Sequence, residues 1–99
     1  MATAEAAADY TYLTLPPGGP LRSCIGLVVA GLAARARIGV GGLEEAIELL
    51  ESQYSVEGPT RYRFSIKDDS LVAEVEDGEI TELREDGGTG WRTVVEMVA

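Results

Sequence analysis

The stretch Thr60–Gly78, TRYRFSIKDDSLVAEVEDG, decides the fold because two runs of alternating residues flank a short polar turn. In the first run, one face carries Tyr62, Phe64 and Ile66. In the second run, one face carries Leu71, Ala73 and Val75. Successive side chains of a strand point to opposite faces, so both runs are typical of half-buried strands. The segment therefore predicts a β-hairpin whose apolar face meets the rest of the core.

The end of this hairpin carries the one local feature that indicates a site. By the same alternation Asp77 falls on the face of Ala73 and Val75, which should meet the helices. An inward carboxylate at the end of a central strand, followed at once by Gly78, is a candidate binding group. Asp-Gly is also among the commonest turn pairs, so a purely structural turn stays open as the alternative.

The composition limits the classes of function. The chain has 99 residues, the size of one domain, and 45% of them are hydrophobic. Its 17 acidic and 8 basic residues give a net charge of −9. We therefore expect no nucleic-acid partner and no membrane partner, because phosphate-rich surfaces require a basic face. A basic protein surface would suit this charge, and solubility alone would also explain it.

Two residue types that often carry chemistry are scarce. The absence of histidine excludes His-based triads and His–metal sites. Cys24 is the only cysteine, which excludes an internal disulfide and a cysteine metal cluster. Residues 1–9 are expected to be a disordered N-terminal tail before a single domain at 10–99. The chain shows neither a signal-peptide pattern nor a run of about 20 apolar residues, so the expected location is the cytoplasm.

The other segments predict two helices and three further strands. Tyr10–Leu15 is rich in β-forming residues, and apolar residues recur at helical spacing in Leu21–Arg37 and Leu43–Tyr54. Ile80–Arg84 fits a short strand. Trp91–Val98 fits both periodicities, and its Thr-Val-Val run favours a strand. The order β-α-α-β-β-β-β predicts an α+β two-layer sandwich, a mainly antiparallel sheet with two helices packed on one face.

Three segments together span most of the chain and point to a known family. They are LTLPPGGPLRSCIGLVVAGLAARARI at 13–38, GPTRYRFSIKDDSLVAEVEDG at 58–78 and DGGTGWRTVVEMVA at 86–99. The first resembles the opening strand, proline-containing turn and first helix of the bacterial anti-sigma factor serine kinases, members of the GHKL ATPase superfamily. The other two are similar to that family's central hairpin and to its last turn and strand. Asp77-Gly78 is the one functional motif among them.

The departures from this family imply that its chemistry has been lost. The resemblance places Gln53 and Leu49 roughly where the family has its Mg²⁺-binding Asn and its catalytic Glu, and leucine cannot take a proton. It places Asp77 where the family's Asp reads the adenine amino group, but Glu-Ile follows Gly78 in place of the glycine pattern D-x-G-x-G. Few residues remain for the family's mobile lid. The implied nucleotide site at Asp77, Gly78 and Gln53 is therefore a relict without catalytic residues.

The resemblance implies a non-catalytic regulatory module that binds a protein and needs no cofactor. The family's members pair with sigma factors, with anti-anti-sigma proteins and with themselves, so transcription regulation through such a partner is the expected function. Arg22, at the start of the first helix, is the implied partner contact, since arginine binds carboxylates well. A solvated arginine is the alternative.

Two other functions stay open. Weak binding of ATP or ADP with Mg²⁺ would make the chain a nucleotide sensor or kinase remnant, although Gln53 could equally be a solvated helix end. A structural homodimer would use an exposed sheet edge or the first helix. Its aromatic anchors, which would serve equally well as core residues, would come from Trp91, Tyr10, Tyr12 and Tyr62.

Overall fold

The fold is described from a computed structural model, in which residues 10–18, 21, 23–39, 41–67 and 70–98 are described. The predicted disordered tail at 1–9 and the predicted partner contact Arg22 lie outside these residues.

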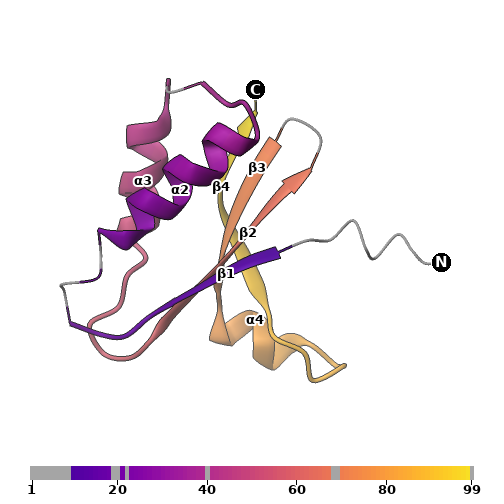
Figure 1. Cartoon of the computed structure of the whole chain (residues 1–99). Helices are drawn as coiled ribbons and strands as arrows, with labels where there is room; N and C mark the ends of the chain where they lie inside the picture. The colour runs from indigo at the N-terminus through magenta and orange to yellow at the C-terminus, as the bar shows by residue number, and fades with distance from the viewer. Residues whose placement is uncertain (1–9, 19–20, 22, 40, 68–69, 99) are drawn as a thin grey trace.

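The helices and strands of the described residues form two layers, with α4 at the lower end of the sheet (Figure 1). In chain order they are β1 (Tyr10–Leu15), α2 (Cys24–Arg35), α3 (Leu43–Glu51), β2 (Thr60–Lys67), β3 (Ser70–Glu76), α4 (Gly78–Leu83) and β4 (Trp91–Val98). The strands make one antiparallel sheet in the order β1-β2-β3-β4. Both α2 and α3 lie on the same face of this sheet, so the α+β sandwich predicted from the sequence is confirmed.

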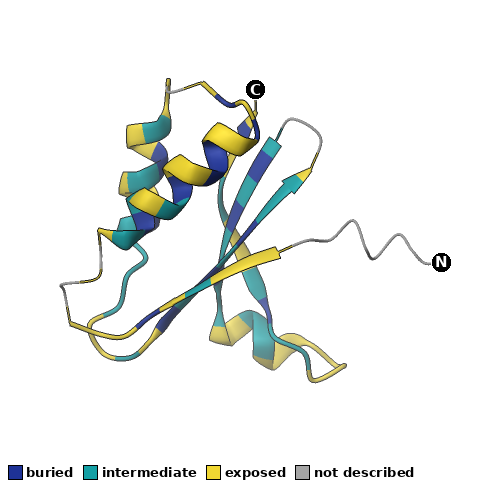
Figure 2. Ribbon diagram, in the orientation of Figure 1, coloured by how far each residue is buried: buried dark blue, intermediate teal, exposed yellow. Residues whose placement is uncertain are grey.

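The central hairpin has the register that the alternation predicts. Tyr62 pairs with Val75, Phe64 pairs with Ala73, and all four side chains are buried. The strands therefore alternate between buried and partly exposed residues along their length (Figure 2). This alternation turns one face of the sheet toward the helices and leaves the other toward solvent.

The two helices bury the stripes that their periodicity predicts. From α2 the sheet receives Ile25, Val29, Leu32 and Ala33. From α3 it receives Ala46 and Leu50. The opposite sides of both helices are exposed, as Figure 2 shows. Because α2 contains β-branched residues that form helices poorly, we attribute its stability mainly to this packing.

Two tyrosine hydroxyls tie the end of α3 to the rest of the fold. The buried Tyr62 donates a hydrogen bond to the Leu50 carbonyl oxygen at 2.7 Å. Tyr54 was expected as the last residue of this helix, but α3 ends at Glu51. The Tyr54 hydroxyl instead donates to the Pro16 carbonyl oxygen at 2.5 Å, which links the segment after α3 to the segment after β1.

The helix α2 is shorter than the predicted Leu21–Arg37 at both ends. At its carboxyl end the Ile38 N–H donates to the Ala33 oxygen at 2.9 Å, and Arg37 adopts a left-handed φ of 59°. These are the bonds and backbone angles of a common helix-ending motif. The chain therefore leaves the helix before the apolar pattern ends.

The short strand predicted at Ile80–Arg84 is wrong, because this segment lies in the helix α4. Asp77 caps the helix: its Oδ1 accepts hydrogen bonds from the N–H of Glu79 at 2.9 Å and of Ile80 at 3.4 Å. The Thr81 N–H then donates to the Asp77 carbonyl oxygen at 3.0 Å. An aspartate cap followed by an acidic first turn favours a helix, and these local bonds outweigh the strand pattern.

The strand predicted at Trp91–Val98 is confirmed as β4. It pairs with β3 through Ala73–Val95 on one side of an irregularity and Glu74–Thr93 on the other. Val94 is the extra residue of this bulge, so strict alternation does not run through the whole strand.

A methyl group added at Gly90 would test the close approach of α4 to the start of β4. A Cβ there would collide with Ile80 Cγ2 and would lie 2.5 Å from the Thr81 nitrogen. Since the backbone cannot yield as a side-chain tip can, we expect Gly90→Ala to lower the free energy of unfolding by about 1–3 kcal/mol in a denaturant titration.

Gly31→Ala is the matched control, because Gly31 lies in α2 and nothing is within 4 Å of its added Cβ. Alanine should stabilise that helix by about 0.5–1 kcal/mol. If both variants had the same free energy of unfolding as the unaltered protein, the close approach of α4 to Gly90 would be contradicted.

Candidate functional site

The candidate site lies where β3, α4 and β4 meet, at Asp77. This residue follows β3 directly, and its side chain is 21% exposed. One carboxylate oxygen, Oδ1, caps α4 as described above. The other, Oδ2, accepts a hydrogen bond from Arg92 Nε at 3.1 Å. Both oxygens of the predicted binding carboxylate therefore have partners within the chain.

Arg92 joins the two polar residues that the sequence singled out. It lies opposite Val75 in the sheet register, on the face that α2 and α3 cover. From there its Nη2 donates to Gln53 Oε1 at 2.6 Å while its Nε contacts Asp77. The structure thus brings Asp77 and Gln53 together through a third residue. The sequence analysis did not identify Arg92 as a site residue. The one signal for it was that its positive charge could pair with Asp77 if β3 and β4 were neighbours.

The resemblance also singled out Gly78 and Leu49. Gly78 is the exposed first residue of α4 and lies next to Asp77 in the chain. Leu49 is 49% exposed and lines a separate hollow between α3 and β4. The hollow beside Gln53 and Arg92 measures about 150 Å³. Pockets for small molecules usually measure about 300–1,000 Å³, so this hollow is small for a nucleoside triphosphate.

The contacts of Asp77 favour its ionised form. The Arg92 guanidinium, together with the backbone N–H groups of Ile80 and Glu79, holds the pKa of the Asp77 carboxyl below its usual value of 3.8. A hydrogen bond to a carboxylate from a cation is stronger than one from a neutral group. A ligand that needed this carboxylate would have to displace Arg92 or unwind the start of α4.

The described residues offer little for a metal or a membrane. Within the described ranges, no group of three or more His, Cys, Asp or Glu side chains is arranged to hold a metal ion. None of the described helices has both the length and the apolar character needed to cross a bilayer.

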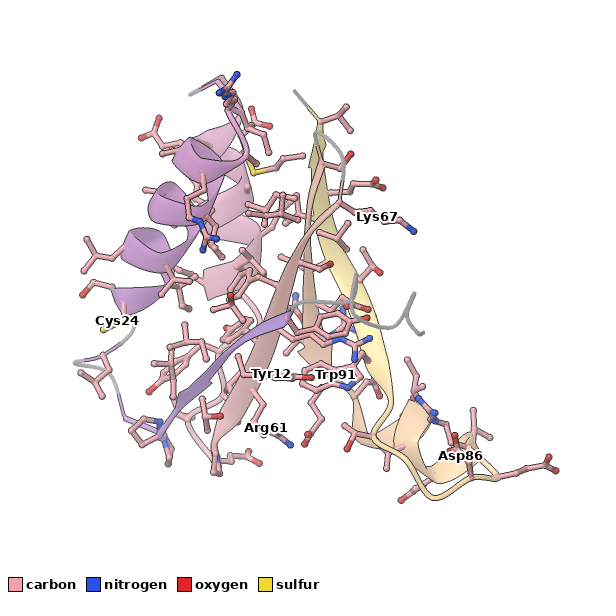
Figure 3. All side chains as sticks on the ribbon, turned by 45° about the vertical axis from the view of Figure 1, so that its right-hand side comes forward. Tyr12, Cys24, Arg61, Lys67, Asp86 and Trp91 are labelled. Atoms are coloured by element: carbon pink, nitrogen blue, oxygen red, sulfur yellow. The ribbon has the colours of Figure 1, made fainter. Side chains whose placement is uncertain are left out.

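A second polar cluster covers the face of the sheet opposite α2 and α3. We call it the aromatic–arginine face and define it by Tyr10, Tyr12, Arg61, Arg63, Glu74, Glu76 and Trp91. Figure 3 shows Tyr12, Arg61 and Trp91 on this side of the sheet, away from the helices. On β1, β2 and β3 these residues have the parity opposite to that of the buried residues. Trp91 reaches the same face because it pairs with Glu76 beyond the bulge in β4.

Arg63 is at the centre of the aromatic–arginine face. Its guanidinium lies 4.3 Å from the ring centroid of Tyr10 and 4.6 Å from that of Trp91. The same guanidinium binds both carboxylate oxygens of Glu74, at 2.7 and 3.2 Å. A two-pronged arginine–carboxylate bond fixes the plane of the guanidinium, so the two rings are held on a rigid support.

The rim of this face is more open. The Arg61 side chain is 42% exposed, binds Glu76 at 2.6 Å, and lies 5.6 Å from the Trp91 ring. Tyr12 is 55% exposed, and its ring is 6.0 Å from that of Trp91. The face therefore presents aromatic surface to solvent.

Four aromatic residues were predicted from the sequence as interface anchors or core residues, and the structure divides them between the outer face and the core. Three of them lie on the aromatic–arginine face, but Tyr62 is fully buried in the core. The roles of Arg61 and Arg63 were missed, because they depend on which strand lies beside β2. The alternation of β2 alone could only show that both arginines point away from the core.

Comparison with known proteins adds no assignment. The chain matches no protein-family model, and it matches no curated protein at a significant level.

Acid unfolding would test the Asp77–Arg92 contact. A carboxyl whose pKa is lower in the folded chain stabilises the fold above its unfolded pKa, and that contribution is lost as the pH falls through the folded pKa. Asp77 therefore stabilises the fold at neutral pH and loses that effect below about pH 4. We expect Asp77→Asn, which keeps a cap acceptor, to flatten the fall in unfolding free energy between about pH 5 and about pH 2.

Asp86→Asn should flatten the same curve, because Arg84 and the Gly88 N–H lower the pKa of Asp86 to about 2. The control is Glu82→Gln, since Glu82 is exposed on α4 and forms no ion pair with a described residue. Denaturant titrations at each pH give the measurement. An Asp77→Asn curve that superimposes on that of the unaltered protein would contradict the Arg92 contact.

Proposed function

We propose that this protein is a non-catalytic module that acts by binding another protein through the aromatic–arginine face. The observation that carries the proposal is the ordered stack of Tyr10, Arg63 and Trp91, with Tyr12 exposed beside it. Tyrosine, tryptophan and arginine are the residues that most often dominate binding energy at protein interfaces. Here they lie together on a face that no described helix covers.

The rigidity of this stack supports a role in binding. Ordering a long side chain at an interface costs free energy, about 0.5–1.5 kcal/mol for each side chain that is immobilised. In the isolated chain, Glu74 already holds the Arg63 guanidinium against the rings of Tyr10 and Trp91. A partner that docks on this face would therefore lose less entropy than one that meets free side chains.

The charges favour a protein over a nucleic acid as the partner. Aromatic rings beside arginines can also stack bases of single strands. Here, however, Arg61 and Arg63 are paired with Glu76 and Glu74, and the whole chain carries a net charge of −9. Nucleic-acid binding depends on unneutralised positive charge, and these pairs remove it.

The Asp77 cluster supports the non-catalytic part of the proposal. Its carboxylate oxygens are bound by α4 and by Arg92, and Leu49 cannot act as a base. The resemblance to anti-sigma factors suggests the class of partner: a sigma factor or an anti-anti-sigma protein in the bacterial cytoplasm. The function would then be regulation of transcription without phosphoryl transfer.

Comparative affinity capture tests the binding face. We expect tagged protein to retain at least one partner that is lost from the Tyr12→Lys variant, because the change replaces an exposed aromatic ring of this face with a charge that a bound partner would have to desolvate. Leu83→Lys is the matched control, since Leu83 is an exposed apolar residue on α4 with 81% exposure. Thermal unfolding should show that both variants are folded. A capture profile that Tyr12→Lys leaves unchanged would refute this face as the binding site.

A nucleotide titration tests the absence of the family's chemistry. We expect no rise in melting temperature with millimolar ATP or ADP, with or without Mg²⁺, because a ligand raises the melting temperature only if it binds the folded state. A saturable, magnesium-dependent rise that Asp77→Asn abolishes would establish a nucleotide sensor instead. Sedimentation of the unaltered protein, repeated over a dilution series, would detect the homodimer alternative.

A further inference from the structure

A second surface, on the opposite edge from β1, has features that the aromatic–arginine face lacks. The strand β4 pairs with β3 and with no other described strand, so its far edge is open. Between this edge and α3 lies a hollow of about 240 Å³. We call it the α3–β4 groove, and its apolar lining residues are Ile38, Ala46, Leu49, Val95, Met97 and Val98.

The second half of β4 lacks most of the features that protect an open edge. An open edge presents unpaired N–H and C=O groups, and proteins normally blunt such edges with several charges, with proline or with a covering element. The segment Thr93–Val98, TVVEMV, contains one charged residue, Glu96, and no proline. Val98 is 67% exposed. The edge therefore offers both backbone hydrogen bonds and apolar side chains to an added strand.

The groove continues along α3 rather than ending at the strand. A neighbouring hollow is lined by Glu45, Glu48, Leu49 and Ser52, and it shares Glu45 and Leu49 with the α3–β4 groove. Leu49 is 49% exposed between the two hollows. The helix thus provides a side wall with an apolar centre, where side chains of an added strand could pack.

The rim of the groove is acidic. Glu45 lines it from α3, and Glu48 lies beside it. Glu96 borders it on β4 but pairs with Val72, so its side chain lies on the outer face of the sheet. None of the three forms an ion pair with a described residue. Glu74 and Glu76, in contrast, are both paired with arginines. Unpaired carboxylates around an apolar centre favour a partner that carries basic residues beside apolar ones.

We propose that the α3–β4 groove binds an extended segment of a partner protein, with alternating apolar and basic residues, as a fifth strand on β4. The backbone bonds to β4 would supply affinity. The apolar side chains would fill the groove, and the basic ones would lie on the outer face of the added strand, beside Glu96. Glu45 would add negative charge on the helix side of the groove. This is the strand-addition mode of peptide recognition.

A second copy of this chain fits the groove less well. Each copy has a net charge of −9, and an antiparallel β4–β4 pair would bring two copies of the same acidic rim together. Like charges at an interface oppose association, whereas a basic segment is attracted. The occupant we infer is therefore a different protein.

A titration with synthetic peptides tests the proposal. The probe is a fluorescein-labelled peptide of alternating valine and lysine, about eight residues long to match β4. We expect it to bind at least about tenfold more tightly than a valine–glutamate peptide, or than the same valine–lysine peptide N-methylated at every residue. N-methylation removes the backbone donors and leaves the charge unchanged. Hydrogen exchange should slow at amides of Trp91–Val98 and not at those of β1.

Matched charge variants show whether the groove is responsible. The double variant Glu45→Lys/Glu96→Lys should weaken binding by about tenfold or more. Glu57→Lys/Glu82→Lys, with the same net charge, should leave binding unchanged, because both residues are exposed and outside the groove. Equal weakening by both double variants, or equal binding of the N-methylated peptide, would overturn the proposal. A dimer that Glu45→Lys/Glu96→Lys strengthens would assign the groove to a second copy instead.

This inference rests on the proposed function only in that the chain binds protein. The capture experiment alters Tyr12 on the outer face, whereas the peptide titration alters Glu45 and Glu96 at the groove. If a captured partner is lost with Tyr12→Lys while the peptide does not bind, the groove alone is refuted. If the peptide binds while capture is insensitive to Tyr12, the outer face is refuted.

Discussion

The buried hydrogen bond between Tyr62 and Leu50 holds the two layers of the molecule in one position. The Tyr62 ring stacks on Phe64 at 6.3 Å between centroids, and its hydroxyl meets the Leu50 carbonyl oxygen at 2.7 Å. A buried polar group without a partner costs roughly 1–3 kcal/mol, so this bond selects one placement of α3 over the hairpin. Leu49 and Gln53 lie close to Leu50 in the chain. The same bond therefore positions one wall of the α3–β4 groove and one end of the Arg92 cluster.

The Arg92 cluster illustrates how a ligand-like set of residues can be satisfied internally. Asp77 and Gln53 come together, as a shared site would require, but the group between them is an arginine of β4. Asp77 also starts α4 through its other oxygen. Each of these bonds stabilises the local fold, and each must be broken before a nucleotide could use the same atoms. That cost is the physical reason why the function we propose is binding.

The two faces available for binding differ in what they offer. The aromatic–arginine face has rings around an arginine whose charge Glu74 neutralises, so recognition there would depend on shape and aromatic contact. At the α3–β4 groove, no described strand covers the edge of β4 and no described residue forms an ion pair with Glu45 or Glu96, so recognition there would depend on strand pairing and on charge. The sheet separates them, and one chain could use both at once.

Most of the fold could be predicted from the sequence, because local periodicity is enough to identify the hairpin, both long helices and the buried face of each element. The strand predicted at Ile80–Arg84 failed because one side chain, that of Asp77, caps a helix there. The candidate sites were harder. Sequence alone identified Asp77, Gln53, Tyr12 and Trp91 as residues of interest. It could not show that Arg92 would bind the first two, or that Arg63 would lie between the rings of Tyr10 and Trp91. Those contacts join residues far apart in the chain, so they depend on strand order and register, which only the packed sheet determines.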